Sequence, residues 1–263
     1  MSDACAWPGG ARCAVTLGYD DSWAYHHSEV APALERRGLR GTFYVTISTD
    51  PLRSPEPWRR VAAAGHELGN HSVNHPCRRD PPEGFQWLEA CYDLRDYTET
   101  RLEQELRVAN LVLHLIDGKS ERTYGNTCCA HAVGRGADER TMDAVLAKLF
   151  VAARGPGFGV CQPAAGMNLM RVGLLGGDRR TFAQLRAEIE RAILTRGWIN
   201  FMFHGVGKGT HALFIERDEH EQLLDWLAQE RGRIWTAPCV EVATHVRAQL
   251  GMPFTPVEPA FSY

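Results

Sequence analysis

The chain has 263 residues, with 29 Lys and Arg against 32 Asp and Glu, and its formal net charge is −3. This near-neutral charge argues against a mainly electrostatic nucleic-acid binder, which needs a basic face. A hydrophobic content of 44 % and a charged content of 23 % exclude global disorder. No apolar run approaches the roughly 20 residues of a membrane span. We therefore expect one folded domain over residues 1–263.

The first residues and the cysteines bear on the compartment. Residues 1–10 contain no basic region followed by an apolar stretch, so we expect no signal peptide and a cytoplasmic protein. The eight cysteines include no Cys-x-x-Cys pair, and disulfide frameworks belong mainly to small secreted domains. We expect reduced, mostly buried thiols.

Strands and helices alternate along the first part of the chain. The sequence predicts strands at 13–17, 41–47 and 66–69, with helices at 25–37 and 58–64 between them. This strand–helix–strand order is typical of parallel strands joined by crossover helices.

A long helix is predicted next, followed by a second series of alternating elements. Residues 86–116 form the long helix, because apolar residues recur every three or four positions. Thr181 and Gln184 form a capping box that opens a later helix. The remaining predicted elements are strands at 149–153, 198–203 and 233–236, a helix at 218–230, and a last helix opened by Pro238. The fold class is α/β.

Two adjacent carboxylates, Asp20 and Asp21, follow the first predicted strand. The carboxyl ends of parallel strands are where sites assemble in such folds. Two carboxylates at the end of an apolar strand are costly unless a cation or hydrogen bonds compensate them. The alternative is an ordinary acidic turn with solvated side chains.

Two histidines, His71 and His75, follow the third predicted strand. A spacing of four places both imidazoles on one face of a helical turn, and neutral imidazole is a common zinc ligand. The zinc-protease motif that His66 and Glu67 would begin fails, because position 70 is Asn.

A lone histidine, His204, ends the most apolar predicted strand. It is either a functional residue or a satisfied core histidine. The glycine-rich segment 205–210 after it lacks the spacing of a phosphate-binding loop. Together the three segments supply three metal ligands, a base and an acid, which is the set that metal-assisted hydrolysis requires.

These segments resemble the motifs of polysaccharide deacetylases of the NodB-homology, carbohydrate-esterase type. Residues 16–22 are similar to the Thr-Phe-Asp-Asp-Gly motif, 65–75 to the His-Ser/Thr-x-x-His motif with its leader, and 201–204 to the late Leu-x-His motif. Order and spacing agree from about residue 12 to residue 248.

The resemblance implies a distorted (β/α) barrel of about seven strands that holds a divalent metal, most often zinc. Asp21, His71 and His75 would be the metal ligands. Asp20 would be the general base that deprotonates the attacking water, and His204 the general acid that protonates the leaving group.

The chain departs from the family in the middle motif, Arg-Pro-Pro-Tyr-Gly. Residues 122–129 correspond to it, with Gly125 at the arginine position and Cys128 at the tyrosine position. The missing arginine could come from Arg154 after another strand, or Arg154 could be a surface residue. The late aspartate that orients the acid histidine has no nearby counterpart, and Asp178 is a distant candidate.

Two residues are expected to contact the substrate, Tyr19 by its place in the first motif and Cys128 through its backbone N–H. The leading hypothesis is an enzyme that removes N- or O-linked acetyl groups from a carbohydrate. The alternatives are a cyclic amide or imide hydrolase with a small substrate, and a non-catalytic metal- or carbohydrate-binding relative. An open groove for a polymer would need exposed aromatics, for which Trp23, Tyr25, Trp58 and Trp87 are candidates. A homo-oligomer is left open.

Overall fold

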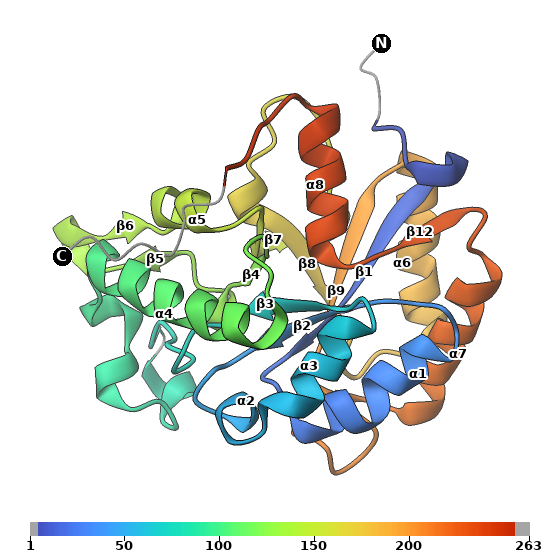
Figure 1. Ribbon diagram of the computed structural model, residues 1–263. Helices are drawn as coiled ribbons and strands as arrows, with labels where there is room; N and C mark the ends of the chain where they lie inside the picture. The colour runs from blue at the N-terminus through green and yellow to red at the C-terminus, as the bar shows by residue number, and fades with distance from the viewer. Residues whose placement is uncertain (1–4, 81, 256–263) are drawn as a thin grey trace.

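Seven parallel strands close into a barrel in the computed structural model, which describes residues 5–80 and 82–255 (Figure 1). The order of the described main sheet is β12-β1-β2-β3-β4-β7-β8-β9, and a pairing of β1 with β9 closes the ring. The eighth strand, β12, lies beside the first half of β1. The strands are β1 Cys13–Asp20, β2 Thr42–Val45, β3 Glu67–Asn70, β4 Tyr124–Gly125, β7 Ala153–Phe158, β8 Val172–Gly176, β9 Trp198–Phe203 and β12 Ile234–Thr236. The predicted barrel of about seven strands is confirmed.

The alternation of side chains in a strand explains how this barrel presents polar groups. In β1, Val15, Leu17 and Tyr19 pack outward in a core cluster against the helices. Gly18 and Asp20 face the other way, and a Cβ at Gly18 would meet the Arg154 side chain. Since successive residues of a strand point to opposite faces, the even positions of β1 face the interior of the barrel.

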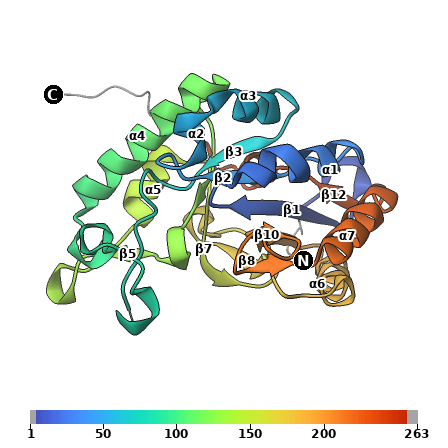
Figure 2. The same ribbon diagram turned by 90° about the horizontal axis from the view of Figure 1, so that it is seen from below.

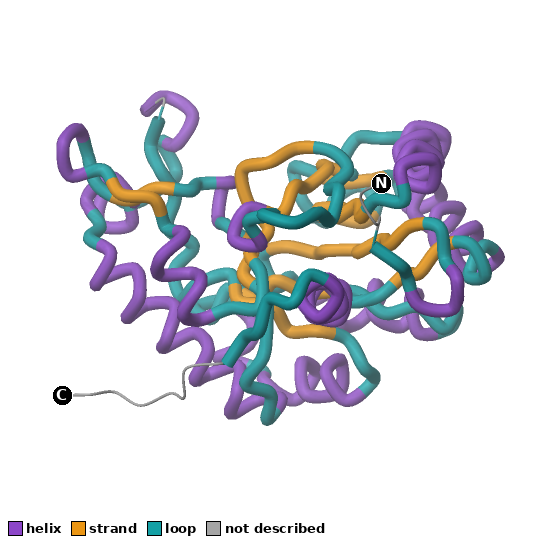
Figure 3. The backbone as a smooth tube through the Cα atoms, turned by 90° about the horizontal axis from the view of Figure 1, so that it is seen from above, coloured by secondary structure: helices purple, strands orange, loops and turns teal. Residues whose placement is uncertain are grey.

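Helices surround the strands on the outside, as the views from below and from above show (Figures 2 and 3). They are α1 Ala31–Glu35, α2 Asp50–Arg53, α3 Pro55–Ala63, α4 Glu99–Asp117, α5 Asp143–Leu149, α6 Phe182–Thr195, α7 Arg217–Gln229 and α8 Cys239–Gln249. Two small sheets complete the described strands, β5 Ala132–Val133 with β6 Arg140–Thr141, and β10 Gly205–Val206 with β11 Phe214–Ile215. No described helix is long and apolar enough to cross a bilayer.

The predicted helix over 86–116 is wrong in its first third. Helix α4 begins at Glu99, because the Thr98 hydroxyl caps it by accepting a hydrogen bond from the Arg101 N–H. The residues before it form short 3₁₀ turns, one of them capped by Asp93. Side-chain capping hydrogen bonds therefore divide a segment whose apolar spacing is typical of one continuous helix.

The predicted strand at 149–153 is also displaced. Leu149 ends helix α5, and strand β7 begins only at Ala153. Strand β8 was not anticipated, since its sequence, Val-Gly-Leu-Leu-Gly, is short and rich in glycine. The capping box is confirmed, with Thr181 and Gln184 exchanging both bonds at the start of α6.

Candidate active site

A cavity of about 1160 Å³ opens over the carboxyl ends of the barrel strands. The residues that follow or end β1, β3, β4 and β9 line it, which is where sites form in parallel α/β barrels. Its lining contains the polar residues Asp20, Asp21, His71, His75 and His204. The structure thus brings the three segments singled out in the sequence to one place.

Asp21, His71 and His75 converge on one point of this cavity. The Asp21 Oδ1 atom lies 3.5 Å from His71 Nε2 and 3.2 Å from His75 Nε2. This oxygen is buried, and in the described part of the chain it has no hydrogen-bond partner. One carboxylate oxygen and two imidazole nitrogens are suitable donors for a divalent cation, so these residues fit the metal that the sequence predicts.

Hydrogen bonds to the backbone orient the His71 ring. His71 Nδ1 lies 2.7 Å from the carbonyl oxygen of Gly125. Because a carbonyl only accepts, Nδ1 carries the proton and the Nε2 lone pair faces Asp21. Gly125 stands where the family has an arginine, and it contributes its carbonyl group instead.

Their spacing in the sequence suggests that the two histidines lie on a helical turn, but in the structure they do not. Residues 71–76 form a loop, and His75 and Asp21 both adopt left-handed backbone conformations, with φ of 53° and 77°. The Ser72 side chain stabilises this loop by accepting a hydrogen bond from the His75 N–H at 2.9 Å. Strained backbone of this kind costs of order 1–3 kcal/mol and is often found at functional sites.

Asp20, the expected general base, is paired with Arg154. The Arg154 Nη2 donates a hydrogen bond to Asp20 Oδ2 at 2.5 Å, and both side chains are buried. Burial raises the pKa of the Asp20 carboxyl, but the charge of Arg154 and its hydrogen bond to Asp20 outweigh this effect and lower the pKa below its usual value. Arg154 is therefore a buried partner of the aspartate and not a surface residue.

His204 is held by Asp178, the candidate that seemed distant in the sequence. The His204 Nδ1–H donates to Asp178 Oδ2 at 2.6 Å, and the backbone N–H of His204 donates to Asp178 Oδ1 at 3.1 Å. Burial alone would lower the pKa of His204, but the hydrogen bond to Asp178 and nearby carboxylates raise it to about 9. At neutral pH the imidazole is protonated and can donate a proton.

The two expected substrate contacts differ in placement. Cys128 lines the cavity and is exposed. Tyr19 does not reach it, because the outward face of β1 carries its side chain. The Tyr19 ring stacks between Phe43 and Phe203, and its hydroxyl lies 2.8 Å from His220 Nε2. The prediction for the Tyr19 side chain is therefore wrong, since a strand cannot direct neighbours 19 and 20 to the same side.

The cysteines also depart from expectation. Cys77 and Cys128 form a disulfide, while the other six cysteines are free. The bond joins the loop after β3 to the loop after β4, and both of these loops border the cavity. The number and spacing of the cysteines in the sequence gave no indication that Cys77 pairs with Cys128, because the two residues are 51 positions apart.

Of the four aromatic candidates for a groove, two line the cavity. Trp23 and Trp87 are 42 % and 62 % exposed, and Phe85 adds a third ring. Trp58 is fully buried in the core, and the Tyr25 hydroxyl donates to the backbone carbonyl of His204. The cavity is accordingly polar at its metal-ligand end and lined with exposed aromatic rings elsewhere.

The fold and the place of these residues at the carboxyl ends of its strands define a (β/α)-barrel class, and comparison with known proteins specifies the family. The family model for polysaccharide deacetylase matches residues 10–142, half of the chain. The chain belongs to the polysaccharide deacetylase family, as its motifs indicate.

Solved structures of low sequence identity share the fold. A structure described as a polysaccharide deacetylase of Mycobacterium smegmatis is 18 % identical, with a TM-score of 0.63 over 98 % of both chains. A family 4 acetyl xylan esterase of Clostridium thermocellum, in complex with cobalt, is 16 % identical, with a TM-score of 0.59 over 94 % of this chain and 96 % of that one. PuuE allantoinase is 13 % identical, with a TM-score of 0.63 over 94 % of both.

A curated relative shows how far the similarity extends within larger proteins. A gellan lyase from a Bacillus species is 22 % identical in an alignment of 258 positions, and this alignment covers 89 % of this chain. The chain spans only 9 % of that relative's length.

Proposed function

We propose that the protein is a metal-dependent hydrolase that removes N- or O-linked acetyl groups from a carbohydrate. The observation that carries this proposal is the convergence, in one cavity, of the Asp21–His71–His75 donor set, the Asp20–Arg154 pair and the His204–Asp178 pair. The family and the esterase with the same fold support an acetylated carbohydrate as the substrate. The motifs extend from β1 to the end of β9, which supports a single catalytic domain.

Asp21, His71 and His75 would hold a divalent cation, zinc in this proposal, which when bound lowers the pKa of a water molecule and polarises the acetyl carbonyl. Asp20 would accept the proton of the attacking water. The charge of Arg154 keeps the Asp20 carboxyl ionised, so that it is ready to act as a base at neutral pH. Arg154 also fixes one Asp20 oxygen, and the other, Oδ1, has no hydrogen-bond partner among residues 5–80 and 82–255.

His204 would protonate the leaving nitrogen or oxygen. Asp178 holds the imidazole through Nδ1, so the Nε2–H is the group free to donate its proton. The backbone N–H of Cys128, at the edge of the cavity, would stabilise negative charge on the acyl oxygen. Trp23 and Trp87 would contact the apolar faces of sugar rings outside the reacting group.

A cyclic amide hydrolase is the second candidate. The observation that favours it is the fold shared with an allantoinase over 94 % of both chains. Its reaction would need the same base, acid and cation, because a cyclic amide, like an N-acetyl group, contains an acyl–nitrogen bond. The two functions differ in the product, which is acetate in one case and a ring-opened acid in the other.

Elemental analysis and product assays on the purified protein test the proposal. We expect bound divalent metal, and acetate release from N-acetylated sugar oligomers or acetylated xylan. The His71→Ala/His75→Ala double variant should lack metal and activity, whereas His114→Ala, at a partly exposed position of helix α4, should retain both. A fully metallated double variant would contradict the ligand assignment. Ring opening of a cyclic amide without acetate release would favour the second function.

A further inference from the structure

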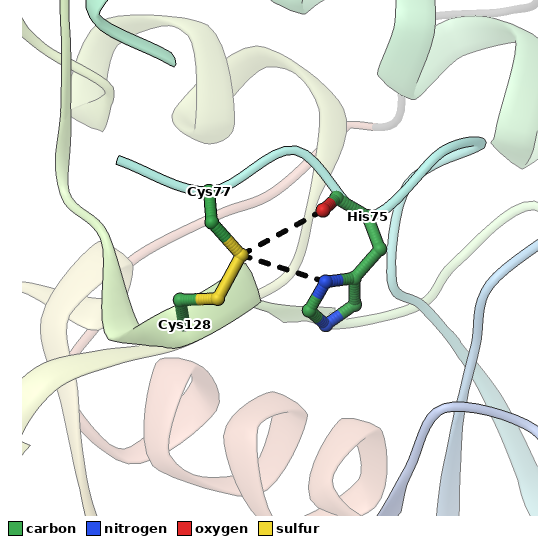
Figure 4. Close-up of side chains that lie close together, drawn as sticks. All are labelled: His75, Cys77 and Cys128. Carbon is green, nitrogen blue, oxygen red and sulfur yellow. Dashed lines mark hydrogen bonds between the residues drawn. A yellow bond between two sulfur atoms is a disulfide. The ribbon is translucent and has the colours of Figure 1, made fainter. Parts of the chain in front are cut away.

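The Cys77–Cys128 disulfide touches a proposed metal ligand from the side opposite the metal. Figure 4 shows the His75 ring beside the bridge, with Cys77 Sγ 3.5 Å from His75 Nδ1. The His75 Nε2 atom faces Asp21 instead. His75 therefore belongs to two groups of donor atoms, one with Asp21 and His71 and the other with Cys77 and Cys128.

The second group has the composition of a soft-metal site. Its two sulfur atoms and one imidazole nitrogen lie within 4.8 Å of one another. Thiolate and imidazole together favour zinc, cadmium or copper(I) over harder cations. The Cα atoms of the cysteines are 5.6 Å apart, which lets two sulfurs separate to the roughly 3.8 Å that tetrahedral thiolate ligands of about 2.3 Å require.

We propose that reduction of the Cys77–Cys128 disulfide creates a second metal site, formed by both thiolates and His75 Nδ1, for a soft cation such as cadmium or zinc. While the sulfur–sulfur bond is intact, the sulfurs are too weak as ligands, so only the site with Asp21 and His71 is open. Cys128 is exposed, so a reductant can reach the bridge. The site adds to the proposed function and does not depend on hydrolytic activity.

The chemistry balances with a phosphine as the reductant. The sulfur–sulfur bond breaks and the two sulfurs gain two electrons and two protons, while the phosphorus is oxidised and takes its oxygen from water. On metal binding both thiols lose their protons and two metal–sulfur bonds and one metal–nitrogen bond form. Neutral His75 has one lone pair, on either Nδ1 or Nε2, so the two sites compete for this ring.

Cadmium titration of the metal-stripped protein, followed by the ultraviolet cadmium–thiolate absorption, tests the proposal. The protein reduced with tris(2-carboxyethyl)phosphine should gain this absorption with one cadmium per chain, and the oxidised protein should not. Cys77→Ser, Cys128→Ser and His75→Ala should each weaken cadmium binding at this site by at least about tenfold.

Matched variants separate this site from its surroundings. Cys91→Ser removes an exposed free thiol and Cys129→Ser the thiol next in sequence, and both should keep the absorption. His71→Ala should also keep it, because His71 belongs only to the other donor set, so failure of the proposed function would leave this result intact. Two results would overturn the proposal: absence of the absorption in the reduced protein, or an absorption in Cys77→Ser and Cys128→Ser that equals that of the reduced wild-type protein.

Discussion

At the residue scale, two adjacent aspartates take different positions because the backbone turns between them. Asp20 is the last residue of β1 and faces the barrel interior, where Arg154 neutralises its charge. Asp21 lies one residue later in a left-handed conformation, with φ of 77°, and meets the two histidines. The proposed base and the proposed metal ligand can therefore be adjacent in the sequence and still lie in different environments.

The Asp178–His204 pair sets the pH range in which the acid is protonated. Asp178, together with the charges of Asp20 and Asp21, raises the pKa of His204 to about 9, so His204 should lose its proton, and activity should fall, as pH rises through that value. Asp178→Asn removes this charge, and the alkaline limb of the kcat/KM profile should move to lower pH. The variant Asp143→Asn, which changes a partly exposed carboxylate that pairs with Arg171 and accepts a hydrogen bond from Asn168, should leave the profile in place. An unchanged limb in Asp178→Asn would contradict the assignment of His204 as the acid.

At the element scale, glycines in neighbouring strands make room for the group that positions Arg154. The Tyr44 ring of β2 packs inside the barrel, and the Arg154 guanidinium lies over it, 4.3 Å from the ring centroid. A Cβ at Gly69 of β3 would approach the Tyr44 ring to 2.6 Å, and one at Gly125 of β4 would approach it to 2.8 Å. Strands β2, β3, β4 and β7 thus jointly fix the partner of Asp20.

Gly69→Ala should therefore lower both stability and activity. The added methyl group forces the buried Tyr44 ring to move, which should cost about 1–3 kcal/mol of unfolding free energy and displace Arg154. Denaturant unfolding and acetate release measure the two effects. Gly176→Ala in β8 is the matched control, because its Cβ would meet nothing within 4 Å. Wild-type stability in Gly69→Ala would show that the Tyr44 packing is not as tight as described.

Elements with strong local signals were predictable from the sequence, and long-range pairings were not. The capping box at Thr181 and the apolar strand at 198–203 were found because their signals lie within a few residues. The disulfide of Cys77 with Cys128 joins residues 51 positions apart and depends on barrel closure. The sequence offered Arg154 as one of two possibilities for the missing arginine, and only barrel closure brings it to Asp20, 134 positions away. The convergence of His71 and His75 was predicted, but through a helical turn that the loop replaces.

At the scale of the whole molecule, the barrel and its helices enclose histidines that the proposed chemistry does not use. His26, His66 and His220 are fully buried. Burial lowers the pKa of His26 to about 4 and the pKa of His66 and His220 to about 3. All three are neutral in the folded protein at pH 5, whereas an unfolded chain protonates histidine below about pH 6.5.

These three histidines should make the fold sensitive to mild acid. Because their pKa values are lowered in the folded state, their contribution to the free energy of unfolding is intact above pH 6.5 and is lost as pH falls toward 4. Each should reduce the unfolding free energy by about 1.4 kcal/mol per pH unit below pH 6.5. Urea unfolding between pH 7 and 5 measures how the unfolding free energy changes with pH. In His220→Gln this slope should be smaller by the contribution of one proton, about 1.4 kcal/mol per pH unit. A flat profile would mean that these histidines titrate in the folded protein.

We propose that Asp20 accepts a proton from water, while Asp21, next to it, would hold the metal. Metal content and acetate release, measured together on Asp20→Asn, test this claim most directly. We predict wild-type metal content with acetate release reduced by about 100- to 10,000-fold, the usual effect of losing a general base. Undiminished acetate release from Asp20→Asn, or loss of its metal, would contradict the account.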